Sequence, residues 1–262
     1  MEEWGKHYVK VMDYATKDVV TVSPETDMET AANLMIEFNI RHLPVKDSSG
    51  HFIGMVGLRD VASIIAKEGV NKLKERKVME YMNVQPIRVY VDDPLFKAVE
   101  MMIEHGVGSV IILDSMERIR GILTEKDVVK FLAVVPSLEK VENVMSPIST
   151  FVLPGSSIRE VLELMTELWT RHLALSKDDE IIGIVSMSKL VKKAMELSPS
   201  APVEEAAEET FKISASTPIS QAAAIMIDKG KEALLVTIGR QVVGMVTEGN
   251  LVRGALEVLS RI

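Results

Sequence analysis

One pattern recurs four times along this sequence and restricts its fold more than any other feature. In each copy a methionine ends an apolar helical pattern, and a glycine follows inside an apolar run. The methionines are Met35, Met102, Met165 and Met226, and the glycines are Gly54, Gly121, Gly183 and Gly244. The four Met-to-Gly separations are 19, 19, 18 and 18 residues. Spacing this regular indicates four copies of one structural unit.

Each methionine closes an amphipathic helix of one design. Apolar residues precede it at positions i, i+3, i+4 and i+7, as in Met28, Ala31, Ala32 and Met35 of the first copy. Nine residues before each methionine stands a residue type that caps helices, namely Thr26, Asp93, Ser156 and Thr217. Pro94 and Pro218 then suit a first helical position, and Thr26 with Glu29 predicts a capping box.

Short apolar runs flank each helix. In the first copy they cover residues 19–22, 42–45 and 52–56, with a hairpin turn at 47–50 and a second helix from about Leu58. Each copy therefore reads strand, helix, strand, strand, helix, which is an α/β fold. Such a unit cannot cover its own sheet, so we expect the copies to pair. A break near Val135 and Pro136 predicts one pair over 8–134 and another over 138–258.

Composition excludes several classes of function. The chain has 262 residues, no cysteine and a formal charge of -8, which argues against disulfides, thiolate metal sites and a coat for nucleic acid. It has no apolar run of membrane-spanning length, and its polar start does not resemble a signal peptide, so we expect a cytoplasmic protein. The five histidines lack metal-ligand spacing, and neither a phosphate-binding loop nor a catalytic triad is visible, so an enzyme is not expected.

Four sequence segments carry a resemblance to a known family. They are GILTEKD at 121–127, its copy GMVGLRD at 54–60, VMS at 144–146 and RHLPV at 41–45. These segments resemble repeats of the cystathionine-β-synthase (CBS) domain family, over about residues 8 to 258. The resemblance implies that two repeats form a Bateman module with two clefts, which binds AMP, ADP, ATP or S-adenosylmethionine. Four repeats in one chain resemble the gamma subunit of AMP-activated protein kinase.

The sharpest candidate site is Thr124 with Asp127, where a strand ends and a helix begins. The helix N-terminus offers free N–H groups to an anion, and a carboxylate can accept two hydrogen bonds from a ribose diol. The alternative is that the two residues only cap the helix. Asp60 has the same place in the first copy, but Gly57 replaces the hydroxyl residue.

The third and fourth copies depart from this pair. Ser186 stands with Lys189, and Thr247 stands with Asn250. Lysine cannot accept from a diol and asparagine offers one neutral acceptor, so capping is the favoured role there. Lys189 could instead meet a phosphate.

Other candidates are basic or apolar. Arg41 with His42 and Arg171 with His172 occupy equivalent places, where the resemblance implies ligand phosphates; the alternative is a surface arginine and a half-buried histidine. Apolar walls for adenine would come from residues that otherwise belong to the core: Val22, Ile40, Val89 and Val107.

Three functions stay open at this point. The first is a sensor of adenine nucleotides that regulates a partner protein, itself unidentified. The second is a module for an S-adenosylmethionine-type ligand, and the third is an assembly protein with vestigial clefts. No catalytic cofactor, metal, membrane or nucleic acid is expected, and the four repeats could close a disc within one chain or stack as a homodimer through their module faces.

Overall fold

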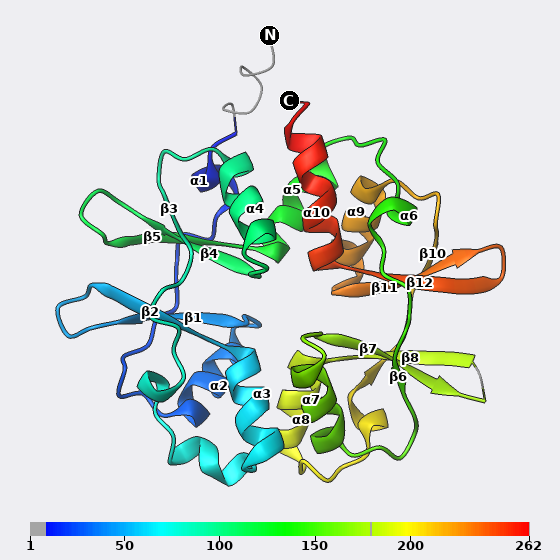
Figure 1. Cartoon of the computed structure of the whole chain (residues 1–262), viewed down its shortest axis with the longest axis horizontal. Coiled ribbons are helices and arrows are strands. Elements are labelled where there is room, and N and C mark those ends of the chain that lie inside the picture. The colour runs from blue at the N-terminus through cyan, green and yellow to red at the C-terminus, as the bar shows by residue number, and fades with distance from the viewer. Residues whose placement is uncertain (1–8, 179, 262) are drawn as a thin grey trace. The chain divides into compact units, whose positions relative to one another are not determined.

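A computed structural model describes residues 9–178 and 180–261 of the chain. Its four repeats each contain a helix, a β-hairpin and a second helix, which confirms the predicted α/β fold (Figure 1). The first helices are α2 (Met28–Glu37), α4 (Leu95–Glu104), α7 (Ile158–Glu167) and α9 (Ile219–Lys229). The second helices are α3 (Leu58–Lys67), α5 (Glu125–Val134), α8 (Met187–Glu196) and α10 (Glu248–Leu259).

Every hairpin is antiparallel, and a short first strand runs parallel to its leading strand. The hairpins are β1 (His42–Lys46) with β2 (Phe52–Gly57), β4 (Ser109–Leu113) with β5 (Ile119–Thr124), β7 (His172–Lys177) with β8 (Glu180–Ser186), and β11 (Ala233–Ile238) with β12 (Gln241–Thr247). The parallel strands are β3 (Arg88–Tyr90), β6 (Phe151–Val152) and β10 (Lys212–Ser214). In the first repeat this strand shrinks to a single bridge between Val22 and Val45.

The chain divides into two compact units. Of the described residues, unit 1 holds 9–19, 86–147 and 211–261, and unit 2 holds 20–85, 148–178 and 180–210. Unit 1 therefore contains the second and fourth repeats, and unit 2 contains the first and third. Each has its own core, and the repeat methionines are buried in these cores: Met102 and Met226 in unit 1, Met35 and Met165 in unit 2.

Within each unit, helices of the two repeats pack directly on each other. In unit 1, α5 packs against α9 and α10, and in unit 2, α3 packs against α7 and α8 (Figure 1). Two arginines tie α3 and α7 in unit 2. Arg59 in the first turn of α3 donates to the Met165 carbonyl at 3.4 Å, and Arg159 in the first turn of α7 donates to the Ala66 carbonyl at 3.0 Å.

The repeat glycines lie where another chain segment crosses the hairpin. Asn83 pairs with Met55 beside Gly54, Thr16 pairs with Ile122 beside Gly121, and Ser146 pairs with Met245 beside Gly244. A Cβ at Gly244 would lie 2.7 Å from the Ser146 carbonyl oxygen, and a Cβ at Gly54 would lie 2.9 Å from that of Asn83. At Gly183 the crossing strand is β9 (Ala207–Glu208), and the nearest atoms are 3.5 Å away. Close approach of backbone therefore requires glycine at Gly54 and Gly244, whereas Gly183 has room for a Cβ.

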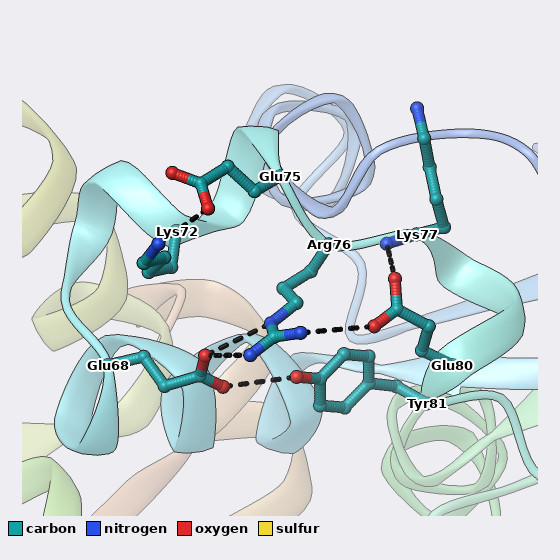
Figure 2. Close-up of polar contacts among 7 residues, drawn as sticks. All are labelled: Glu68, Lys72, Glu75, Arg76, Lys77, Glu80 and Tyr81. Atoms are coloured by element: carbon teal, nitrogen blue, oxygen red, sulfur yellow. Dashed lines mark hydrogen bonds and ion pairs between the residues drawn. The ribbon is translucent and has the colours of Figure 1, made fainter.

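The remaining short elements belong to these crossing segments. They are α1 (Val11–Tyr14), α6 (Val141–Val144) and the 3₁₀ turns η2 (Val70–Lys74), η3 (Val78–Glu80) and η4 (Val203–Ala206). A polar network fixes the segment that follows α3 (Figure 2). The Arg76 guanidinium donates to Glu68 and, at 3.4 Å, to Glu80, while the Tyr81 hydroxyl donates to Glu68 at 3.2 Å. The network holds the segment that reaches Asn83.

The predicted helix caps are wrong by one residue. The N-caps are Asp27, Pro94, Ser157 and Pro218. The Asp27 carboxylate accepts the Thr30 N–H at 2.8 Å, whereas the Thr26 hydroxyl accepts the Ser23 N–H at 3.1 Å and shapes the preceding turn. A real capping box forms between Ser157 and Glu160. Aspartate and serine cap helices as well as threonine does, so residue type alone could not decide which of two neighbouring residues is the N-cap.

Candidate functional site

The same backbone arrangement occurs at one place in every repeat. The first residue of the second helix donates its N–H to the residue that precedes the hairpin: Leu58 to Arg41, Glu125 to Gly108, Met187 to Arg171 and Glu248 to Glu232, at 2.8 to 3.1 Å. The next hairpin residue then pairs with the helix cap, as His42 does with Gly57 and His172 with Ser186. Sequence positions that were aligned by spacing therefore lie at equivalent helix N-termini, where N–H groups favour an anion.

Unit 2 gathers basic residues at its two copies of this place. Burial and the charges of Arg41 and Arg171 lower the pKa of His42 to about 3. The His42 imidazole is therefore neutral at pH 7, although two guanidinium groups act on it. Arg41 of the first repeat and Arg171 of the third, 130 residues apart in sequence, thus both lower the pKa of His42 in unit 2. His172 follows Arg171 and is buried, with 4% of its surface exposed.

A third arginine joins this group. Burial and the charge of Arg171 lower the pKa of Arg59, and the neighbouring Asp60 carboxylate opposes that change. We call Arg41, Arg59 and Arg171 the arginine cluster. Asp60 accepts the Gly57 N–H at 2.8 Å, and burial raises its pKa against the effects of that hydrogen bond and of Arg59. Asp60 is therefore the carboxylate next to the cluster.

In unit 1, Thr124 and Asp127 form the capping arrangement that was the alternative to a ligand site. One oxygen of the Asp127 carboxylate accepts both the Thr124 N–H at 3.0 Å and the Thr124 hydroxyl at 2.7 Å. Its other oxygen accepts from Lys130 at 2.9 Å. The Asp127 side chain is buried, with 2% exposed. A role in ribose binding would have to share these oxygens and stays a prediction.

The third and fourth repeats use their hydroxyls as caps. The Ser186 hydroxyl accepts the Lys189 N–H at 3.4 Å, and the Thr247 hydroxyl accepts the Asn250 N–H at 3.3 Å. The Lys189 ammonium lies 3.5 Å from Glu208. Asn250 reproduces the Asp127 geometry, because its side-chain oxygen accepts the Thr247 N–H and hydroxyl, each at 2.9 Å.

The apolar candidates belong to the two cores. Val22 is buried in unit 2, and Ile40 packs against that core. Val89 is buried in unit 1, and Val107 packs against its core. Ile40 and Val107 are only partly buried, whereas Val22 and Val89 are buried. Contact of any of them with adenine stays a prediction.

Four residues that lie at these places were assigned no role from the sequence: Arg59 and Trp169 in unit 2, and Glu125 and Glu248 in unit 1. Arg59 lies over the Trp169 ring, with its guanidinium carbon 4.8 Å from the ring centroid. At the first helical position, which holds Leu58 and Met187 in unit 2, unit 1 has the buried glutamates Glu125 and Glu248. A comparison of equivalent positions could have singled out Arg59, because the other three repeats have Lys126, Ser188 and Gly249 there.

The chemistry that the unit 2 site can perform is anion binding. Guanidinium groups bind phosphate through a planar fork of donors, and two helix N-termini favour the same charge. Among the described residues no cluster of three or more His, Asp or Glu side chains could hold a metal ion. In the same part of the chain, no helix has both the length and the apolar character needed to cross a membrane.

Comparison with known proteins agrees with this repeat architecture. The model of the CBS domain matches residues 11–67, 78–134, 141–196 and 208–257. In structure, the chain is similar to protein MJ1225 of Methanocaldococcus jannaschii, described as a proposed archaeal homologue of g-AMPK. The TM-score is 0.83 at 20% identity, over 94% of this chain and 99% of that one. This similarity concerns the fold.

Curated relatives match only part of the chain. An uncharacterized 33.4 kDa protein in a ribosomal RNA operon of Thermofilum pendens is 29% identical over 58% of this chain and 55% of its own length. MJ1225 is 31% identical in sequence over 46% of each. An inosine-5'-monophosphate dehydrogenase of M. jannaschii is 31% identical over 46% of this chain but only 23% of the enzyme. The chain thus spans about half the length of the first two relatives.

Proposed function

The chain belongs to the CBS domain family, and we propose that it is a regulatory protein that binds adenine nucleotides. The observation that carries the proposal is the arginine cluster of unit 2, with His42 held neutral beside it. Three guanidinium groups of one unit act near two helix N-termini, in a chain whose net charge is -8. Such a local excess of positive charge suits the phosphates of AMP, ADP or ATP.

Carboxylates are the proposed ribose acceptors. Asp60 fits this role best, because only its hydrogen bond from the Gly57 N–H is built into the cap and its raised pKa reflects a desolvated carboxylate. Asp127 is the second candidate and would have to share oxygens with Thr124 and Lys130. A buried carboxylate binds a diol strongly, since charged hydrogen bonds exceed neutral ones.

We further propose that consecutive repeats form the two Bateman modules, over 8–134 and 138–258. The support is reciprocal crossing of the chain: the segment leading into the second repeat pairs with the hairpin of the first at Asn83 and Met55, and the segment before the first repeat pairs with the hairpin of the second at Thr16 and Ile122. The third and fourth repeats repeat this exchange at Glu208 and Ser146. Each hairpin therefore depends on the neighbouring repeat's lead-in segment.

The competing ligand, S-adenosylmethionine, fits the charge less well. Its sulfonium is cationic and it has no phosphate, so its single carboxylate gives the arginine cluster a weaker partner than a nucleotide phosphate does. An assembly protein without ligand is the other alternative. A catalytic function is not proposed, because each repeat segment is accounted for by the CBS fold. The regulated partner is an unidentified protein. A nucleotide can change the affinity for that partner only if it binds one state of the module more tightly than another.

Calorimetric titration of nucleotide-stripped protein with AMP, ADP, ATP and S-adenosylmethionine tests the proposal. Asp60→Asn and Asp127→Asn are the ribose variants, because Asn250 demonstrates that asparagine keeps the capping geometry. If one of these aspartates binds the ribose, loss of its charged acceptor should weaken nucleotide binding about 10-fold in the corresponding variant. Absence of any nucleotide binding would favour the assembly protein.

A further inference from the structure

Arg59 occupies a position where the other repeats have no arginine. It is the second residue of α3, and the equivalent residues are Lys126, Ser188 and Gly249. Two residues before it, Gly57 caps α3 without a side chain. The next residue is Asp60, the carboxylate of the proposed ribose site. A long cation at this position can therefore reach across the helix N-terminus of the first repeat toward the third.

Two weak interactions hold the Arg59 guanidinium. It lies 4.8 Å from the centroid of the Trp169 ring and donates to the Met165 carbonyl at 3.4 Å, near the long limit for a hydrogen bond. Trp169 follows α7 in the left-handed conformation, with φ of 52°, and is 77% exposed. A stacked cation with one long bond to a neutral carbonyl is easily drawn to a stronger partner.

The charges around Arg59 favour such a partner. Arg171 repels it and burial removes part of its hydration, while Asp60 alone among the charges that act clearly on it is attractive. A phosphate between Arg59 and Arg171 would remove this repulsion. It would also offer charge-assisted hydrogen bonds, which are roughly twice as strong as neutral ones.

We propose that Arg59 is a specificity-determining residue that turns from Trp169 to the ligand and selects nucleotides with more than one phosphate. This inference rests on the proposed function. Arg41 and Arg171, one from each repeat, suffice to neutralise a single phosphate group. Arg59 adds a third positive charge, which only a second phosphate balances, so Arg59 distinguishes ADP and ATP from AMP.

The experiment compares AMP and ADP binding by calorimetry in the wild type and in Arg59→Leu. The expected result is about a 10-fold loss of ADP affinity with AMP affinity changed less than about 3-fold. Arg59→Lys keeps the positive charge but loses the planar set of guanidinium donors, so its ADP affinity should lie between those of the wild type and Arg59→Leu. Arg159→Gln is the matched control, because Arg159 ties the same two helices through the Ala66 carbonyl and is expected to leave the ADP-to-AMP ratio unchanged.

A spectroscopic readout tests the movement without altering Arg59. The chain has two tryptophans, so Trp4→Phe leaves Trp169 as the only fluorophore of its kind. ADP should change Trp169 emission, and inorganic pyrophosphate should do so without any adenosine. Equal losses of AMP and ADP affinity, unchanged ADP affinity in Arg59→Leu, or constant Trp169 emission on saturation would overturn the role of Arg59 and leave the proposed function standing. A wild type that binds no adenine nucleotide would overturn the proposed function as well.

Discussion

Unit 1 and unit 2 build the same helix N-terminus from opposite charges. At the residue before the hairpin, unit 2 has Arg41 and Arg171, whereas unit 1 has Gly108 and Glu232. At the first helical residue, unit 2 has Leu58 and Met187, whereas unit 1 has the buried glutamates Glu125 and Glu248. The backbone hydrogen bond that defines the place is the same in all four repeats.

The repeat determines the geometry of this helix N-terminus but not its charge. Backbone pairing and the buried methionines determine where these side chains lie, whichever type they are. The chemistry of each unit is then set by a few substitutions at equivalent positions. In unit 2 they gather guanidinium groups, and in unit 1 they place carboxylates and small residues at the same helix ends.

His42 should make the stability of unit 2 depend on pH. Its pKa is lowered to about 3 in the folded protein, whereas an unfolded histidine titrates near 6.5, so the unfolded chain binds more protons between these values. Stability should therefore fall as the pH drops from 7 to 5, by about 2 kcal/mol from this one residue. Denaturant unfolding at both pH values measures it.

His42→Ser is the control, because Ser109 is the equivalent residue of unit 1. The variant should lose most of this pH dependence. Asp60, whose raised pKa makes it bind a proton more readily in the fold, gives an opposite slope that both proteins share. If the variant and the wild type lose stability equally, the neutral state of His42 is wrong.

An effect of similar size separates the third and fourth repeats at their glycines. Gly244→Ala in unit 1 places a Cβ 2.7 Å from a backbone oxygen, and such overpacking should cost about 2 kcal/mol. Gly183→Ala in unit 2 meets its nearest atom at 3.5 Å and should change stability by less than about 0.5 kcal/mol. Thermal unfolding of the pair gives the order, and equal shifts in melting temperature would contradict the packing argument.

The smallest effect is a gain in stability. Gly57→Thr copies Thr124 into the first repeat, where the new Cβ would lie 3.6 to 3.7 Å from the Arg41 carbonyl oxygen, Asp60 and His42. These are ordinary contacts, so the loss of chain entropy in the unfolded state should stabilise the protein by about 0.5 kcal/mol. A clear destabilisation in chemical denaturation would show that unit 2 cannot accept the side chain of unit 1.

The regular spacing made the repeat, its helices and its hairpins predictable, because each methionine is buried in a core and each glycine lies where another segment crosses the hairpin. The helix caps were misplaced by one residue, since Thr26 and Asp27 are both good caps and only the fold decides between them. The position of Arg59 on Trp169 could not be predicted, because 110 residues separate them in sequence. The double use of Asp127 as cap and candidate ligand also required the structure.

Replacing one charge of the arginine cluster by the charge that unit 1 has at the equivalent position tests phosphate binding by this cluster. Arg171→Glu gives the third repeat the residue that Glu232 supplies in the fourth. By calorimetry, this variant should bind ADP at least about 100-fold more weakly than the wild type, because one charge-assisted contact becomes a repulsion, while adenosine affinity stays the same. ADP affinity that is unchanged in Arg171→Glu would contradict phosphate binding by the arginine cluster.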